Sequence, residues 1–449
     1  MKKLLLAFYG DDFTGSTDAL EQLALAGIRA ALFIGPPEPG QLKRFPGLQA
    51  VGVAGMTRSL APGPMRRELR PALKKLKALG ARHVHYKVCS TFDSSPKVGN
   101  LGCVLDVASE VFHRPFVPLL VAAPCLGRHC VFGNLFARFG IGSNGEIHRL
   151  DRHPSISKHP VTPMKEADLR LHLAKQTKRK IALFDILQLA LPENERCAAL
   201  NRVLANKPGV VLFDVLYPEQ LLAIGKMINN YASAKHPLFS IGSSAIETAL
   251  TAGWAQSSSA GFRRKRFART AATQILVGSG SCSPVTERQI GWALKHGFGE
   301  IALDATALVH DKDVAREMLR AIAAAVTLLR AGRSVIIHTT RRGADQHIAG
   351  QLKSHTARVL GTALGEVLRS TLEQVRVRRL CIAGGDTSSY AARAMGVEAL
   401  EMIAPLTRGA PLCRASAPDS PADGLEVVFK GGQVGPENYF NIVKQGGYH

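Results

Sequence analysis

Acidic residues are scarce in this 449-residue chain: 35 Asp and Glu stand against 57 Lys and Arg, and the formal net charge is +22. Disordered chains combine high charge with low hydrophobicity, and a composition that is 46% hydrophobic and 20% charged excludes that class. The positive electrostatic field of a chain with this net charge attracts anions. Because no aromatic-interleaved basic repeat accompanies the charge, we expect small anionic substrates as partners and no nucleic acid.

Long apolar runs and paired cysteines are also missing. No apolar stretch reaches the ~20 residues that span a bilayer, and the first apolar run meets Asp11 and Asp12 without a cleavage site. None of the eight cysteines lies in a CxxC pair, so a zinc site has no sequence support and the thiols are expected to be reduced. The sequence therefore predicts a cytoplasmic protein with no membrane partner and no metal-ligating residues.

Short apolar runs alternate with amphipathic helical patterns along the whole chain, as in 4–9 followed by 16–26. This alternation predicts an α/β protein: two doubly wound domains with largely parallel sheets and a cleft between them. The stretch 257–269 reads SSSAGFRRKRFAR and has no periodic apolar face, which is typical of a linker. The predicted domains are therefore 1–256 and 270–449. The polar stretch 140–163 is expected to be an excursion whose histidines (His148, His153 and His159) are solvated.

Ligands of open parallel sheets gather at the carboxyl ends of the strands, so the residues after each predicted strand are the first candidates for chemistry. Asp11 and Asp12 follow the first strand, between Gly10 and Gly15. One acid is explained by capping the next helix. Two acids beside two glycines favour a functional site, where a carboxylate accepts a proton from a substrate hydroxyl or holds hydroxyls by hydrogen bonds.

Two further strand ends carry groups suited to a hydroxylated acid. Arg58 follows the third strand, and its planar fork matches a carboxylate, although a lone surface arginine remains the alternative interpretation. The segment 87–102 after the next strand holds hydroxyls, an acid, two lysines and an amide, although such clusters also occur in ordinary loops. The candidate substrate-binding residues are Arg58, Lys87, Ser90, Thr91, Asp93 and Asn100.

Three glycine-containing turns follow strands in the second half of the chain. Small residues there leave backbone N–H groups open to phosphate oxygens, and three such turns in one domain favour a nucleotide site, although each alone is weak. Neither GxxxxGK[ST] nor GxGxxG after a strand occurs, so a P-loop enzyme and an NAD enzyme are not indicated. The candidate nucleotide-binding residues are Ser281, Ser283, Gly384, Gly385, Asp386, Thr387, Gly431 and Gly432.

Taken in order, these motifs resemble the four-carbon acid sugar kinase family over the whole chain, and in motif they look closest to its 3-oxo-tetronate kinases. The resemblance rests on residues 11–15, Arg58, SerThrPheAspSer at 90–94, GlyAsnLeuGly at 99–102 and HisProValThrProMet at 159–164. It rests equally on SerGlySerCysSer at 279–283 with Thr286 and Gln289, on GlyGlyAspThrSer at 384–388 and on the closing glycine turn. The closing turn (GlyGlyGlnValGly) and the CysLeuGlyArgHisCys run after Pro124 depart from the usual family pattern.

The resemblance implies an N-terminal domain that binds the acid sugar and a C-terminal domain that binds ATP. The expected reaction is ATP- and Mg²⁺-dependent phosphorylation of the terminal hydroxyl of a 3-oxo-tetronate, threonate or erythronate type of acid. Asp12, with Asp11 as second choice, is expected to accept the hydroxyl proton. The alternatives are a branched oxo acid such as 3-oxo-isoapionate as substrate, or a non-catalytic acid-sugar sensor. A homodimer is also expected.

Overall fold

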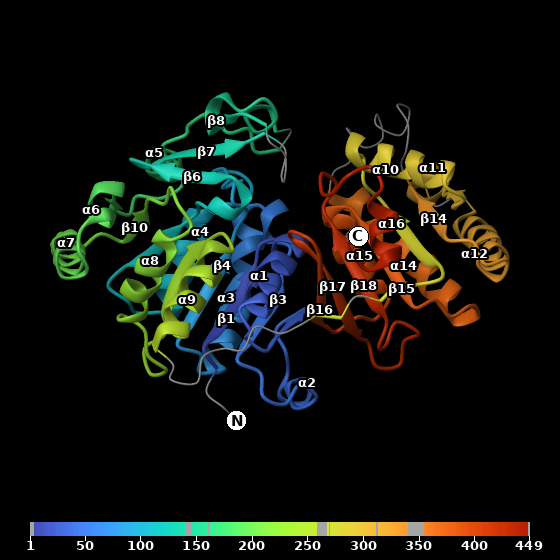
Figure 1. The fold of residues 1–449 in the computed structure, drawn as a ribbon, viewed down its shortest axis with the longest axis horizontal. Coiled ribbons are helices and arrows are strands. Elements are labelled where there is room, and N and C mark those ends of the chain that lie inside the picture. The colour runs from blue at the N-terminus through green and yellow to red at the C-terminus, as the bar shows by residue number, and fades with distance from the viewer. Residues whose placement is uncertain are drawn as a thin grey trace. The chain divides into compact units, whose positions relative to one another are not determined.

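A computed structural model describes residues 4–139, 145–159, 161–257, 267–268, 270–310, 313–339 and 354–447. The chain divides into two compact units (Figure 1). The first contains residues 1–11, 22–30 and 36–265, and the second contains residues 12–21, 31–35 and 266–449. Two short N-terminal segments therefore belong to the second unit. The predicted domain limits, 1–256 and 270–449, stay predictions, and most of the predicted linker lies outside the described residues.

The first unit is built on a parallel sheet with the strand order β3-β1-β4-β11-β5-β10-β9. Its central strands are buried along their whole length, which explains their near-continuous apolar sequences. The strands are β1 (Leu6–Gly10), β3 (Ala50–Ala54), β4 (His83–Lys87), β5 (Val117–Leu120), β9 (Ile181–Phe184), β10 (Val210–Phe213) and β11 (Leu238–Gly242).

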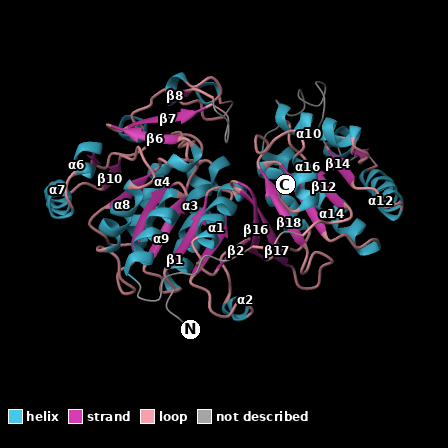
Figure 2. Ribbon diagram, in the orientation of Figure 1, coloured by secondary structure: helices cyan, strands magenta, loops and turns pink. Residues whose placement is uncertain are grey.

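Side chains of β4 show that helices cover both faces of this sheet, because successive residues of a strand point to opposite faces. His85 bonds to Glu247 of α9 at 2.6 Å, whereas Tyr86 bonds to Thr57 at 2.7 Å on the other face. The helices of the unit are α2 (Pro39–Lys43), α3 (Pro62–Ala78), α4 (Leu101–Val111), α5 (Leu169–Ala174), α6 (Ile186–Ala190), α7 (Glu193–Ala205), α8 (Gln220–Asn229) and α9 (Ala245–Ser257) (Figure 2). Single 3₁₀ turns are η1 (Thr57–Ser59), η2 (Pro124–Leu126), η3 (Leu150–Arg152) and η4 (Ile156–Lys158).

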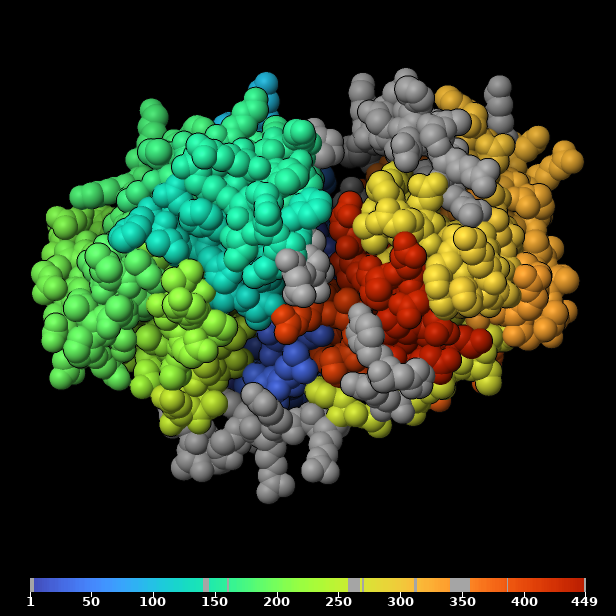
Figure 3. Space-filling model, turned by 45° about the horizontal axis from the view of Figure 1, so that its top comes forward, coloured from blue at the N-terminus to red at the C-terminus, as the bar shows by residue number. Residues whose placement is uncertain are grey.

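A second, antiparallel sheet lies at the carboxyl end of the parallel strands. It consists of β6 (Arg128–Val131), β7 (Asn134–Arg138) and β8 (Ile147–Arg149), drawn in teal in Figure 1. Asp214, just past β10, holds the β6–β7 turn by accepting hydrogen bonds from the N–H groups of Phe132 (2.6 Å) and Gly133 (2.9 Å). In Figure 3 the small sheet and the green residues after it form one continuous surface of this unit.

The second unit contains a five-stranded parallel sheet of order β13-β14-β12-β15-β18. Val277 of β12 packs with α10 and α16, and its neighbour Gly278 faces Leu364 and Leu368 of α14, so this sheet is also covered on both faces. The strands are β12 (Ile275–Ser279), β13 (Gly299–Ala302), β14 (Val335–His338), β15 (Arg379–Ala383) and β18 (Glu426–Lys430). The helices are α10 (Pro284–Lys295), α11 (Ala305–Val309), α12 (Val314–Arg330), α14 (Ser354–Gln374), α15 (Gly385–Ala394) and α16 (Tyr439–Gln445).

A long antiparallel hairpin extends the parallel sheet of the second unit. Its strands are β16 (Ala399–Thr407) and β17 (Ala410–Ser416), and β17 pairs with β18. Residues 32–33 of β2 (Ala30–Phe33) pair with β16. Residues 13–21 of α1 (Phe13–Leu25) pack beside the same unit, with the ring of Phe13 4.6 Å from that of Phe429. The start of α1 therefore lies next to the end of β18.

The predicted α/β class with largely parallel sheets is confirmed. The expectation of solvated histidines in the polar excursion is wrong for His153, which is 2% exposed. Its Nδ1 accepts hydrogen bonds from the N–H groups of Ser155 and Ile156, so it organises the turn that it belongs to. Within the described ranges, no helix is long and apolar enough to cross a membrane.

Candidate functional site

The end of β1 joins two of the predicted site residues. Asp11 is 3% exposed, and its carboxylate accepts two hydrogen bonds from Arg58: Nε to Oδ2 at 3.1 Å and Nη2 to Oδ1 at 2.7 Å. The N–H of Arg58 also donates to the carbonyl of Asp11, at 3.0 Å. Because a carboxylate already occupies the fork of Arg58, this arginine positions Asp11 and offers less to a substrate than the sequence alone suggests.

Asp12 belongs to the second unit and directly precedes α1. Its Oδ1 accepts a hydrogen bond from the N–H of Gly15 at 2.7 Å, and its Oδ2 accepts one from the hydroxyl of Thr14 at 3.0 Å. A Cβ added to Gly431 would lie 4.0 Å from the Thr14 hydroxyl oxygen. Asp12 thus caps a helix, as the alternative interpretation supposed, and in the same unit it lies close to the closing glycine turn.

The segment after β4 gathers most of the other predicted substrate residues. Lys87 is 2% exposed and donates to the carbonyl of Val88 at 3.0 Å. Thr91 donates to Asp93 at 2.8 Å, and both Ser90 and Asp93 are half-buried. A buried ammonium on the last residue of β4, and a carboxylate and two hydroxyls just after it, therefore lie at the carboxyl end of the strand, where parallel sheets bind ligands.

Two residues fix the shape of this segment. Asn100 accepts a hydrogen bond from the N–H of Cys103 at 2.7 Å and donates to the carbonyl of Pro96 at 2.9 Å, so it caps α4 and holds the loop. Phe92 is fully buried with φ of 58°, a left-handed conformation that is costly for a bulky residue. Such strain gathers at ligand-binding loops, where the surrounding structure maintains it.

Arg128 was missed as a site residue in the sequence. It begins β6, is 5% exposed, and its Nε is buried without a hydrogen-bond partner in the described part of the chain. Burial lowers the pKa of Arg128, an effect that Cys89 and Asp93 oppose by favouring its charge. This guanidinium therefore faces the segment after β4. The sequence signal for this residue was the pair Gly127 and Arg128, which comes soon after β5. In the structure Gly127 adopts φ of 69°.

Three glycine-containing turns of the second unit lie close together. A Cβ added to Gly432 would lie 2.6 Å from the Ser281 hydroxyl oxygen, and one added to Gly384 would lie 3.4 Å from the Ser281 nitrogen. A Cβ added to Gly280 would lie 2.2 Å from the Thr387 hydroxyl oxygen. Glycine is thus required at Gly280 and Gly432 because the turns after β12, β15 and β18 touch there.

Two helices begin at these turns. The hydroxyl of Ser283 accepts a hydrogen bond from the N–H of Val285 at 3.2 Å and caps α10, whose first residue is Pro284. Helix α15 begins at Gly385, and Asp386 lies in its first turn, with a side chain outside the described part. Helix N-termini present unpaired N–H groups and a positive dipole end, so two of them beside glycine turns suit the phosphates of a nucleotide.

Beneath the closing glycine turn lies a polar cluster that the sequence did not single out as a site. Lys430 is fully buried, and its Nζ donates to the hydroxyl of Thr286 at 3.0 Å. That hydroxyl donates in turn to the carbonyl of Gly432 at 2.9 Å. The amide nitrogen of Gln289 lies 3.0 Å from each of three carbonyls, those of residues 434, 435 and 436.

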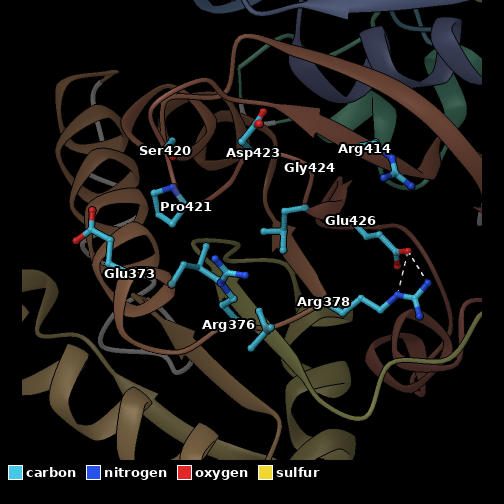
Figure 4. A pocket seen from close by; sticks show the side chains of 12 residues that line it. Glu373, Arg376, Arg378, Arg414, Ser420, Pro421, Asp423, Gly424 and Glu426 are labelled. Carbon is cyan, nitrogen blue, oxygen red and sulfur yellow. Dashed lines mark hydrogen bonds and ion pairs between the residues drawn. The ribbon is translucent and has the colours of Figure 1, made fainter.

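A cavity of about 630 Å³ lies at the amino ends of the strands in the parallel sheet of the second unit, opposite the glycine turns (Figure 4). Arg378 and Glu426, at the amino ends of β15 and β18, line it together with Arg376 and Arg414. Because β15 and β18 run from this cavity to the glycine turns, it is separate from the candidate nucleotide site. Its arginines are balanced by Glu373, Asp423 and Glu426.

Comparison with known proteins follows the same division of the chain. Residues 6–250 match the family model of a sugar-binding N-terminal domain, and residues 276–440 match that of a nucleotide-binding C-terminal domain. Crystal structures of proteins from Salmonella typhimurium LT2 (TM-score 0.76, 22% identity, 98% of each chain) and Haemophilus influenzae (TM-score 0.70, 21% identity, 98% of this chain and 99% of the other) share the fold.

Two curated relatives extend over nearly the whole chain. The 3-oxo-isoapionate kinase of Paraburkholderia graminis is 42% identical, covering 99% of this chain and 94% of the relative. The 3-oxo-tetronate kinase of Methylobacterium radiotolerans is 30% identical, covering 97% and 98%. The chain therefore belongs to the four-carbon acid sugar kinase family.

Proposed function

We propose that this chain transfers the γ-phosphoryl group of ATP to a hydroxyl of a branched 3-oxo sugar acid, with 3-oxo-isoapionate as the first candidate. As a member of its family the chain is a sugar-acid kinase, a phosphotransferase whose acceptor is an alcohol group. The relative that acts on 3-oxo-isoapionate is 42% identical, against 30% for the 3-oxo-tetronate kinase named above. This difference reverses the order of substrates that the motifs alone favoured.

One observation of the structure carries the proposal: the start of α1, with Asp12, lies beside the glycine turns of the second unit. The Thr14 hydroxyl is 4.0 Å from the place of a Gly431 Cβ, and Gly432 touches Ser281. Phosphoryl transfer depends on holding the acceptor hydroxyl and the phosphate in line and on neutralising charge. A carboxylate next to a phosphate-binding turn is suited to accept the proton of that hydroxyl.

In the proposed mechanism, buried cations of the first unit bind the substrate carboxylate. Lys87 and Arg128 are the best suited, since the fork of Arg58 is engaged by Asp11. Thr91 and Asp93 orient the hydroxyl groups of the acid, with Ser90 and Asn100 supporting the segment. Asp12 accepts the proton from the attacking hydroxyl oxygen, and the broken bond is that between the γ-phosphorus and its bridging oxygen, so ADP leaves with the electron pair.

Magnesium is expected to arrive on the triphosphate. Mg²⁺ in kinases binds through phosphate oxygens, water and one or two carboxylates, so it needs no dedicated protein cage. Among the described residues, no group of three or more His, Cys, Asp or Glu side chains could hold a metal ion. When bound, the ion neutralises charge on the phosphate oxygens.

A screen for ADP release tests the proposal. The full chain is incubated with ATP, Mg²⁺ and, in turn, 3-oxo-isoapionate, 3-oxo-tetronate, threonate and erythronate. We expect the highest kcat/KM with 3-oxo-isoapionate. A higher value with 3-oxo-tetronate would assign the unbranched acid instead. ATP binding without ADP release from any of the four would favour the sensor interpretation and overturn the proposal.

A further inference from the structure

The closing glycine turn rests on a buried cation, Lys430, for which the described residues supply no acidic partner. Lys430 is fully buried at the end of β18, and its ammonium contacts the hydroxyl of Thr286 and the ring of Tyr439, 5.5 Å from the ring centroid. No carboxylate in the described part of the chain pairs with it. Burying a charge without a counter-charge is costly. An anion that binds nearby would lower this cost.

The cluster beneath the turn also sets the direction of the peptide groups above it. The carbonyl of Gly432 accepts from Thr286, and those of residues 434, 435 and 436 all lie 3.0 Å from the amide nitrogen of Gln289. In a trans peptide the N–H points opposite to the C=O. Drawing the carbonyls of Gly432 and Val434 toward α10 therefore turns the N–H groups of Gln433 and Gly435 the other way.

A row of N–H groups held in this manner forms a concave site for an anion. Gly432 faces Ser281 and Ser283 across the same turn, because a Cβ placed on it would lie 2.6 Å and 2.9 Å from atoms of these two residues. The phosphate chain of a nucleotide supplies the negative charge that such a turn binds, and the buried ammonium below would strengthen the field at that place.

We infer that Lys430, Thr286 and Gln289 form a phosphate-positioning clamp for the nucleotide, in which the ammonium of Lys430 acts through the Thr286 hydroxyl on the closing glycine turn. The inference rests on the proposed function and deepens it. Lys430 is a positioning residue, because its own side chain is fully buried and reaches the turn only through Thr286.

The protonation state of Lys430 depends on the groups packed around it. Burial lowers the pKa of Lys430 from 10.5 to about 8. Cys381 of β15 interacts electrostatically with Lys430, and burial raises the pKa of its thiol to about 12, so it stays neutral. Thr286 of α10 has no titratable group, and Tyr439 of α16 contacts the ammonium through its ring. Above about pH 8 the ammonium is therefore lost, and with it the attraction for phosphate.

Calorimetric titration of the full chain with ATP, ADP and adenosine between pH 6.5 and 9.5 tests the clamp. Wild type should bind ATP with a Kd that rises by up to about tenfold per pH unit above pH 8, whereas adenosine binding should not change. Lys430→Met should bind ATP about 10- to 100-fold more weakly at pH 7 and without that pH dependence. Lys295→Met, on the exposed end of α10, removes the same charge and serves as the control.

Thermal unfolding separates a positioning role from a structural one. The ligand-free Lys430→Met protein should have a Tm at pH 7 equal to or above that of wild type, because it lacks a buried unpaired ammonium. Wild type should gain stability from pH 8 to 10, since the unfolded chain keeps a proton there that the folded chain has released, and the variant should not. A lower Tm with unchanged ATP affinity would overturn the inference and leave Lys430 a structural residue.

A second pair of variants guards against a Lys430→Met protein that fails to fold. Thr286→Val removes the hydroxyl that links the ammonium to the turn and should weaken ATP binding about tenfold, with Thr286→Ser restoring it. Equal ATP affinity in Thr286→Val and wild type would overturn the clamp. Failure of wild type itself to bind ATP would instead overturn the proposed function, so the two are told apart.

Discussion

Arg58 holds Asp11 by two hydrogen bonds, of 3.1 and 2.7 Å, at the end of the first strand. The carboxylate is nearly buried (4% side-chain exposure) and the guanidinium is partly open (25%). A bidentate pair in this setting fixes the orientation of both groups. It also means that removal of either member takes a charged hydrogen-bond partner from the other.

Asp11→Asn should therefore lower the free energy of unfolding by about 1–3 kcal/mol, because the guanidinium loses the negative charge that accepts two of its hydrogen bonds. Arg58→Lys should cost less, since lysine keeps the charge but not the fork. Urea unfolding of both single variants and of the double variant measures the coupling. The control is Arg66→Lys, whose pair with Glu110 is exposed and should change stability by less than about 0.5 kcal/mol. Equal losses in control and test variants would contradict the prediction.

Asp12→Asn should reduce kcat about 10²- to 10⁴-fold and leave the Kd for ATP nearly unchanged, because the amide cannot take the hydroxyl proton. The helix cap should survive, since an amide oxygen can still accept the hydrogen bond from Gly15. Steady-state kinetics with the best acid of the ADP-release screen and calorimetry with ATP supply the two measurements.

The matched control for that variant is Asp304→Asn. Asp304 caps α11 by accepting hydrogen bonds from two N–H groups at 2.9 and 3.0 Å, and it is exposed. The same chemical change is thus made at a cap with no role in the reaction. Normal turnover in the Asp12 variant, or an equal fall in the Asp304 variant, would remove Asp12 as the base.

Sequence periodicity predicted the parallel strands and most helices because each has a buried apolar run or stripe. It missed the hairpin β16–β17, which is interrupted by Pro405 and Pro411, residues that argue against a strand when read locally. It also could not assign residues 31–35 to the second unit. That assignment follows from antiparallel pairing of β2 with β16, a contact between segments more than 360 residues apart.

The candidate site was predictable where the chain brings its groups together locally, as in the glycine turns. Two features were not. The partner of Arg58 depends on the register that places η1 beside the end of β1, and the burial of Lys430 depends on the packing of α10 and α16. Both are tertiary properties, and no spacing within one segment encodes them.

Glu21→Gln should remove a pH dependence of stability. Burial raises the pKa of the Glu21 carboxyl from 4.5 to about 8, against the lowering effect of the hydrogen bond from the Gly409 N–H. The folded protein then keeps a proton that the unfolded chain releases, so this group's contribution to stability falls as the pH rises from 4.5 to 8.

The variant retains an oxygen that can accept from Gly409 and has nothing to ionise. At pH 7 it should be more stable than wild type by up to roughly 3 kcal/mol, and near pH 4 the two should agree. Unfolding in urea at several pH values gives the difference directly. Glu366→Gln makes the same chemical change on the exposed face of α14 and serves as the control. A difference that is constant with pH would contradict the assignment.

Arg379 connects the strand starts to the C-terminal helix, and its loss should be far more damaging than that of its neighbour Arg378. Arg379 is fully buried. It bonds to Glu426 and donates to the backbone carbonyls of Val443 (2.6 Å) and Thr270 (2.8 Å). Arg378 bonds to the same carboxylate from the rim of the cavity in Figure 4, with half of its side chain exposed.

Arg379→Met removes the hydrogen-bond donors of several buried acceptors at once. It also leaves the carboxylate of Glu426, the first residue of β18, with Arg378 as its arginine partner. The expected loss is about 3–5 kcal/mol in the free energy of unfolding, against less than about 1 kcal/mol for Arg378→Met. Urea unfolding of the two variants measures both, and fluorescence of Trp292 in α10 reports on the same unit. Similar small losses in both would show that the exposed pair holds Glu426 well enough alone, and that α16 is anchored by its apolar contacts.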